Sequence, residues 1–374
     1  MPGSPGKGER AYAYAKACGI IGKSCIGKRI AGLESVSRLS ELDRAIFPSS
    51  SQNLPEKELL PNLENRIIQR SVKSIISIVD SFSKVPELLS LLIRSYEYAD
   101  LKSAITASLE GDKKVPSHTD IGVFQTVHFD KWPDIQAMIK GTEFSFLLTK
   151  KGVLQSGPGG VSLHTSLDRH YYGALWKSLK SLGRADRRAA EKILLDEISL
   201  KNAMWALRLR TYYRMSQEQI KVYLIDRPVK TFSWNRQTRR GKFQDPAGQN
   251  RNQAPLLFQG IVKFRSLASD AVRSLEFPLD SYSAWSSWRW AKFLNPETGG
   301  GLWKADPRYF QNAASRYLYR LARRNFRSSP FSLGTIFCYI KLKQYEEDIL
   351  TSGAEGLGMG MSGKEIFSAL GVQQ

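Results

Sequence analysis

The chain has 374 residues, 42% of them hydrophobic and 24% charged, and its formal net charge is +20 at neutral pH. This length and composition are typical of a globular protein of two or three domains, and no apolar run approaches the ~20 residues that cross a bilayer. Three cysteines are too few for a disulfide framework and fit a reducing cytoplasm. Residues 1–8 lack the apolar region of a signal peptide, so any membrane association is expected through a partner or through charge.

Helical periodicity dominates the first third of the chain. Alanine-rich residues 11–16 lead into residues 17–24, which match a relaxed phosphate-loop pattern. A working phosphate loop leaves a buried strand and opens a helix, whereas the residues before this one are themselves helical in character. We therefore interpret the segment as a helix packed through small residues. Further helices are predicted at 66–82 and 87–109, and prolines punctuate this region between and before them: Pro48, Pro55, Pro61 and Pro86.

The middle of the chain is also predicted to be mainly helical. Residues 123–129 and 144–148 are short strands at most, and residues 152–160 form a glycine-rich loop. Helices are predicted at 166–182 and 187–213, with Gly183 as the C-cap between them.

A polar, basic segment follows at residues 226–255. Its basic residues alternate with Phe232, Trp234 and Phe243, a combination that single-stranded RNA recognition uses for phosphate contacts and stacking. A second basic group follows helical spacing and is predicted to form a solvated helix face: Arg316, Arg320, Arg323 and Arg327. The chain has no signature of a known RNA-binding module. A cytoplasmic RNA-binding protein that uses the 226–255 loop is therefore the alternative hypothesis, and nucleic acid is not the partner that we favour.

The last third contains two further patterns that could suggest a function. Trp285 and Trp288 are spaced for one helix face, and we favour a core position over an interface. Residues 358–365 nearly match a phosphate loop, but Glu365 stands where Ser or Thr would hold magnesium, so we interpret a loop between helices. No metal-ligand spacing or catalytic constellation stands out along the chain. We expect no catalytic site, cofactor, metal or small-molecule substrate.

A short helical pattern occurs three times in the chain. Leu-Lys-polar triplets begin at Leu101, Leu200 and Leu342, and the first two are followed by apolar residues on one helix face. Recurrence at this length suggests triplication. The sequence therefore predicts an all-α fold of three related helical bundles at residues 10–115, 116–225 and 258–374, with residues 226–257 as an insertion.

The surroundings of these triplets carry a family resemblance. The motifs, in order, are at residues 11–17, 166–175, 196–202, 208–213, 330–334 and 339–350. Together they resemble the C subunit of the bacterial and archaeal V-type (A-type) ATPases, which is similar to the d subunit of the eukaryotic V-type ATPases. The resemblance runs from about Arg10 to the C-terminus. It departs at Asp100, where that family more often has an asparagine-containing motif, and at the insertion.

The resemblance implies a non-catalytic coupler on the cytoplasmic face of the membrane. Such a protein is an all-helical funnel around a pseudo-threefold axis. It seats the D and F subunits of the central shaft and rests on the proteolipid ring, and the membrane subunit of the stator is a further candidate partner. The basic surplus would face an acidic shaft tip or the anionic membrane surface.

Seven residues are candidate signature or partner-contact positions: Lys102, Asp196, Lys201, Arg208, Arg210, Lys343 and Glu346. The alternative is that these groups cap or bridge helices within each unit. Charge reversal of Arg208 and Arg210 together distinguishes the two, because loss of shaft binding with intact helical circular dichroism indicates contact. Unfolding indicates a bridging role.

Overall fold

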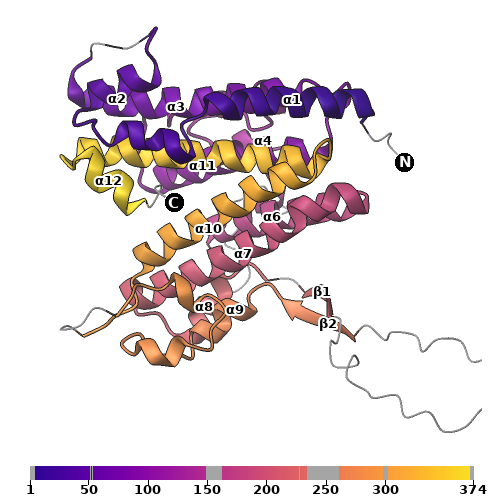
Figure 1. Ribbon diagram of the computed structural model, residues 1–374, viewed down its shortest axis with the longest axis vertical. Helices are drawn as coiled ribbons and strands as arrows, with labels where there is room; N and C mark the ends of the chain where they lie inside the picture. Colours follow the sequence, from indigo (N-terminus) through magenta and orange to yellow (C-terminus); the bar gives the residue numbers. More distant parts are fainter. Residues whose placement is uncertain are drawn as a thin grey trace, which may run out of the picture.

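The computed structural model describes residues 5–50, 52, 54–148, 162–226, 228–233, 261–297 and 302–370. Helices dominate it, which confirms the predicted all-α fold (Figure 1). The first half contains α1 (Lys7–Lys23), α2 (Leu39–Ile46), α3 (Glu56–Val79), α4 (Glu87–Leu109) and α5 (Ile135–Ile139). The second half contains α6 (Leu163–Ser181), α7 (Arg184–Tyr213), α8 (Gln217–Tyr223), α9 (Ser269–Ser274), α10 (Pro307–Ser328), α11 (Leu333–Gly358) and α12 (Gly363–Ala369). None of the helices in these ranges is long and apolar enough to span a membrane.

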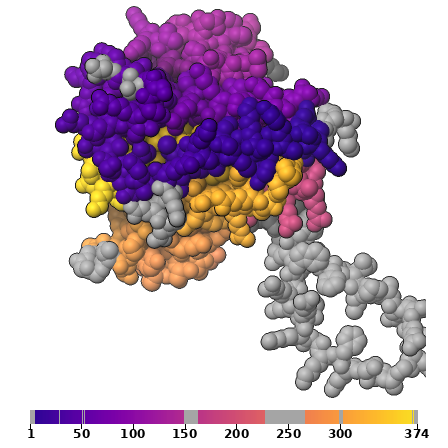
Figure 2. All heavy atoms as spheres, turned by 45° about the horizontal axis from the view of Figure 1, so that its top comes forward, coloured from indigo at the N-terminus to yellow at the C-terminus, as the bar shows by residue number. Residues whose placement is uncertain are grey.

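Helix α11 lies at the centre of the molecule. It packs against α3, α7 and α10, and with fewer contacts against α1 and α4. Figure 1 shows it between the layer of α1 and α3 and the pair of α10 and α7, and Figure 2 shows α1 crossing directly over the yellow-orange surface of α10 and α11. Its residues 336–340 are all buried. Because five consecutive residues point to every side of a helix, this segment must be enclosed by neighbours.

The N-terminal turn of α11 approaches the N-terminal turn of α7 at Gly334. A Cβ atom on Gly334 would lie 2.4 Å from the backbone oxygen of Asp186, closer than real contacts allow. The Asp186 carboxylate also accepts hydrogen bonds from Leu333 N at 2.9 Å and from Arg10 Nη1 at 2.8 Å. Helices α1, α7 and α11 therefore meet at one point, where the absence of a side chain on Gly334 is required.

The predicted core positions of Trp285 and Trp288 are confirmed. Both of them, and the neighbouring Trp290, are at most 3% exposed, and each indole N–H donates to a protein oxygen. Residues 17–23 lie inside α1, as predicted, but Gly19 and Gly22 do not mediate its packing, because a Cβ atom at either would meet nothing within 4 Å. Residues 359–362 connect α11 to α12, so the predicted loop between helices is confirmed.

Several local predictions are wrong. Residues 123–129 and 144–148 form 3₁₀ turns at Gly122–Phe124, Phe129–Lys131 and Glu143–Leu147 instead of strands. Gly183 is the N-cap of α7, because α6 already ends at the extended residue Leu182. Pro61 lies inside α3, in its second turn, where only one helical hydrogen bond is lost.

One of the described strands lies at the start of the predicted insertion, and the other lies shortly after its end, in the unit predicted to be a helical bundle. Strand β1 (Pro228–Ser233) pairs with β2 (Ile261–Ser266) in an antiparallel ladder, with Pro228 opposite Ser266. The remainder of the 226–255 loop, which the RNA-binding hypothesis concerns, lies outside the described residues. The division into three related units and their arrangement as a funnel remain predictions.

Candidate functional site

Charged side chains from α4, α6 and α7 meet around one carboxylate. Lys102 Nζ on α4 lies 2.8 Å from Asp168 Oδ1 on α6, and Lys201 Nζ on α7 lies 3.0 Å from the same oxygen. Two ammonium groups therefore share one carboxylate, which leaves this cluster with a local excess of positive charge.

The cluster continues one helical turn along α7. Glu197 accepts hydrogen bonds from Lys341 Nζ of α11 at 2.9 Å and from Tyr172 OH of α6 at 3.2 Å. Tyr172 follows Asp168 by one turn on α6, and Lys201 also lies over the Tyr172 ring, 5.0 Å from its centroid. We call the whole set the seam: Lys102, Asp168, Tyr172, Glu197, Lys201 and Lys341.

The seam is half-buried, which sets its electrostatics. Its charged side chains are 14–26% exposed. Burial lowers the pKa of Lys102, although the neighbouring Asp168 carboxylate opposes this. Burial also disfavours ionised Asp168, but the ammonium groups of Lys201 and Lys102 outweigh burial and lower the pKa of that carboxyl. Asp168 is therefore held as a carboxylate that joins α4, α6 and α7.

The α7 face that carries Glu197 and Lys201 becomes exposed toward the end of the helix. Trp205, Arg208 and Tyr212 continue the same face at helical spacing. Trp205 is 37% exposed and Tyr212 is 52% exposed, while Arg208 Nη2 donates to Gln311 Oε1 of α10. Trp, Tyr and Arg are the side chains most enriched where binding energy concentrates at protein interfaces. We call these three residues the exposed row.

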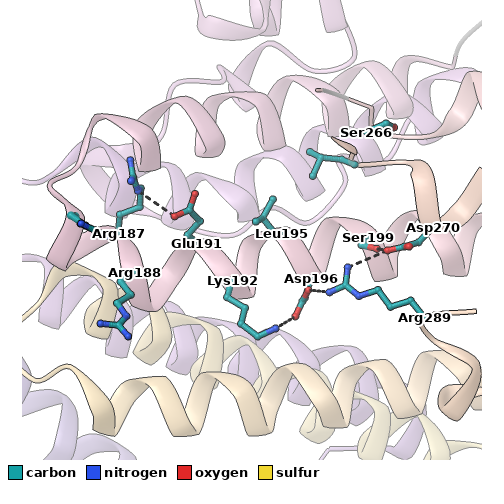
Figure 3. A pocket seen from close by; sticks show the side chains of 12 residues that line it. Arg187, Arg188, Glu191, Lys192, Leu195, Asp196, Ser199, Ser266, Asp270 and Arg289 are labelled. Atoms are coloured by element: carbon teal, nitrogen blue, oxygen red, sulfur yellow. Dashed lines mark hydrogen bonds and ion pairs between the residues drawn. The ribbon is translucent and has the colours of Figure 1, made fainter. Parts of the chain in front are cut away.

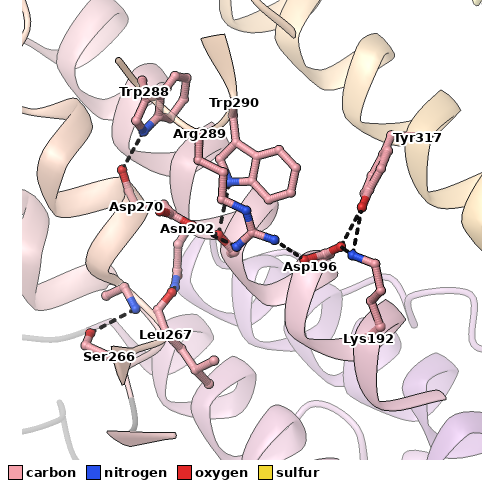
Figure 4. A network of polar contacts seen from close by, with 12 residues as sticks. Lys192, Asp196, Asn202, Ser266, Leu267, Asp270, Trp288, Arg289, Trp290 and Tyr317 are labelled. Carbon is pink, nitrogen blue, oxygen red and sulfur yellow. Dashed lines mark hydrogen bonds and ion pairs between the residues drawn. The ribbon is translucent and has the colours of Figure 1, made fainter. Parts of the chain in front are cut away.

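Asp196 lies on a different side of α7 and is buried (Figure 4). Its carboxylate accepts from Arg289 Nη2 at 2.5 Å, Lys192 Nζ at 2.8 Å and Tyr317 OH at 2.6 Å. Arg289 also pairs with Asp270 of α9 at 3.2 Å. This network connects α7 with α9, α10 and the 286–290 segment, so Asp196 acts within the fold.

Lys343 and Glu346 form a buried pair on α11. The Glu346 carboxylate bonds Lys343 Nζ, accepts from Cys25 N at 2.6 Å and lies 3.4 Å from Arg70 Nη2. Burial disfavours its charged form, but Lys343, the Cys25 N–H and Arg70 together outweigh burial and lower the pKa of Glu346. The pair therefore attaches α11 to α3 and to the segment after α1.

The seven predicted residues thus divide into two groups. Lys102, Lys201 and Arg208 lie on the half-buried seam or the exposed row, where each also contacts another helix, whereas Asp196, Lys343 and Glu346 bridge elements in the interior. Arg210 belongs with the second group, because Nη1 donates to the backbone oxygens of Phe277 at 2.5 Å and Ser274 at 3.3 Å.

Sequence reasoning missed other members of the seam as site residues: Asp168, Tyr172, Glu197 and Lys341. All four occur in the motifs that carry the family resemblance, and helical spacing places Asp168 with Tyr172 and Glu197 with Lys201. Within the described ranges, no cluster of His, Cys, Asp or Glu side chains could hold a metal ion.

Glu347, also on α11, gives a pH-dependent prediction. Its carboxylate accepts from Tyr96 OH at 2.7 Å, and burial raises its pKa to about 7. A raised folded-state pKa means that stability is greatest below the unfolded value and declines as pH rises through 7. Glu347→Gln should therefore stabilise the protein at pH 8 by on the order of 1–2 kcal/mol, and have little effect at pH 5. Thermal unfolding at both pH values tests this.

Glu276→Gln, at an exposed glutamate that follows α9, is the control for Glu347→Gln and should show no such difference between the two pH values. Equal stability changes for Glu347→Gln at pH 5 and pH 8 would contradict the assignment.

Comparison with known proteins gives two matches. A family model described as ATP synthase (C/AC39) subunit matches residues 50–233. The chain is also 25% identical over 353 residues to an uncharacterized protein from Treponema pallidum (strain Nichols), with 93% of this chain and 92% of that protein covered. The family match includes the seam residues of α4, α6 and α7 and the exposed row.

Proposed function

Over residues 50–233 this chain belongs to the ATP synthase (C/AC39) subunit family, and from this premise we propose that it is the non-catalytic central-stalk component of a V-type ATPase. It couples the rotating shaft, made of the D and F subunits, to the membrane proteolipid ring during ATP-driven or ATP-producing ion transport. It is peripheral and lies on the cytoplasmic face. The family match carries the proposal, and two properties of the structure support it.

The first supporting property is the set of ion pairs that connect one helix to another. Arg10 on α1 pairs with Asp186 on α7 at 2.8 Å, and Lys341 on α11 pairs with Glu197 on α7 at 2.9 Å. The buried Asp196 and Glu346 networks add further connections between elements. A rotor part must transmit torque without yielding, and close-packed helices with buried polar bridges resist relative displacement.

The second supporting property is the exposed row on α7. Its aromatic and arginine side chains continue directly from a seam with a local excess of positive charge. Such a surface complements an acidic protein surface, and electrostatic complementarity contributes to partner choice and association rate. We propose that the tip of the shaft docks against Trp205, Arg208 and Tyr212.

The proposal is tested by purification of the tagged chain from gently solubilised membranes at moderate salt, followed by mass spectrometry. We expect shaft proteins and a small proteolipid in the recovered complex. Recovery of RNA and ribosomal proteins instead, with binding lost as salt rises, would favour the RNA-binding alternative and contradict the rotor assignment.

The exposed row gives a prediction about single residues. Trp205→Ala combined with Arg208→Glu should reduce recovery of the shaft proteins by about tenfold while leaving the helical circular dichroism unchanged. This double variant tests the interface more directly than a double change at Arg208 and Arg210. Arg210 donates hydrogen bonds to the backbone oxygens of Ser274 and Phe277, so its replacement would also disturb the fold. Arg324→Glu, an exposed residue of α10, is the control and should leave recovery unchanged. Full recovery with the double variant would remove the exposed row from the interface.

A further inference from the structure

A cleft of about 750 Å³ lies along the first half of α7 (Figure 3). Arg187 and Glu191 stand along one edge of this α7 face, and Arg188 and Lys192 stand along the other. The cleft is also lined by Leu195 of α7 and by Leu267, which precedes α9. Arg188 and Glu197 are separated by about two and a half helical turns, so the cleft and the seam occupy opposite faces of α7.

The acidic residues of the cleft are already paired. Glu191 accepts from Lys180 Nζ at 2.7 Å and lies 3.2 Å from Arg187 Nε. Asp196 and Asp270 belong to the network around Arg289. By contrast, Arg184 and Arg188 are exposed and lie within salt-bridge distance of no carboxylate in the part of the chain that the structure describes. The cleft therefore presents uncompensated positive charge.

The spacing of the cations indicates what they bind. Arg184, Arg188 and Lys192 follow one another at intervals of four residues, so their Cα atoms are about 6 Å apart along the axis of α7. Carboxylates at the same intervals on a second helix would have the same spacing. The two leucines of the cleft can then contact an apolar residue of that helix, which an inorganic polyphosphate does not have.

We propose that this cleft is a second docking surface, which binds an acidic amphipathic helix of a partner protein with carboxylates at one-turn intervals. The guanidinium groups of Arg184 and Arg188 pair with these carboxylates, and Leu195 and Leu267 pack against an apolar residue one turn further along. This interaction is separate from shaft docking, because it uses the opposite face of α7.

The proposal is tested with two labelled peptides of about 18 residues, long enough for measurable helicity. One peptide carries three glutamates at successive four-residue intervals and a leucine one turn later, and the other has the same composition in scrambled order. Fluorescence anisotropy measures their affinity for the full chain. The ordered peptide should bind about tenfold more tightly than the scrambled one, because only its carboxylates match the cation row.

Variants assign the binding to the cleft. Arg184→Glu with Arg188→Glu should abolish the tenfold preference, whereas Arg324→Glu with Arg327→Glu, a pair of exposed residues on α10, should retain it. Circular dichroism confirms that each variant is folded.

Equal affinity for both peptides, or a preference that survives the cleft substitutions, would overturn the proposal. Tripolyphosphate that binds the cleft more tightly than the ordered peptide would also overturn it, in favour of a small anion. The cleft variant should still recover the shaft proteins, so failure here is distinguishable from failure of the rotor assignment.

Discussion

Replacing Asp196 by alanine should lower the free energy of unfolding by about 2–3 kcal/mol, because a buried carboxylate that accepts three hydrogen bonds is lost while the cations left behind, Arg289 and Lys192, are partly exposed. The carboxylate is 2% exposed and accepts hydrogen bonds from Arg289, Lys192 and Tyr317. Without it, the hydroxyl of Tyr317 and the Nη2 group of Arg289 lose a partner inside the structure, although Arg289 Nη1 keeps its ion pair with Asp270. Urea unfolding followed by circular dichroism measures the loss.

The matched control for this change is Lys192→Ala. The Lys192 side chain is 57% exposed, so its pair with Asp196 is screened by solvent and its removal should cost less than about 1 kcal/mol. A loss of that small size for Asp196→Ala as well would show that the network around Asp196 does not stabilise the fold. Asp196 would then again be a candidate residue for partner contact.

Asp196 also illustrates what the sequence could and could not predict. Its position in a motif marked it as important, but its partners Arg289 and Tyr317 are 93 and 121 residues away along the chain. No local spacing predicts such contacts. Helical spacing can indicate which residues share one helix face, as for Asp168 with Tyr172, but not which neighbouring helix that face meets.

Among the helices and strands as well, some elements could be predicted from the sequence and others could not. The helix predicted at 87–109 is confirmed at the same residues, because a long amphipathic pattern without internal breakers defines it. The described strands at 228–233 and 261–266 were missed, although residues 262–265 of the second strand alternate apolar and polar side chains. The first strand lies in a segment whose basic, polar composition led us to predict a loop, and the second lies in the predicted helical unit at 258–374. The short 3₁₀ turns were missed because three to five residues cannot show a helical period.

Gly334→Ala should destabilise the protein by about 2–3 kcal/mol, although alanine favours helix formation over glycine. The new Cβ would lie 2.4 Å from the backbone oxygen of Asp186 and 2.9 Å from Ala189 Cβ. Helix α11 must therefore move away from α7. That movement strains the hydrogen bond from Leu333 N to Asp186 and, through the same carboxylate, the pair with Arg10. Urea unfolding measures the change in stability.

The control is Gly19→Ala in α1, where a Cβ meets nothing within 4 Å. Here the same substitution should stabilise the protein by about 0.5–1 kcal/mol, because only helix propensity changes. The two variants are therefore expected to differ in sign. If both stabilise the protein, the contact between α7 and α11 is looser than the structure indicates. The packing and hydrogen bonding between these two helices would then not account for the stiffness that we propose for a rotor component.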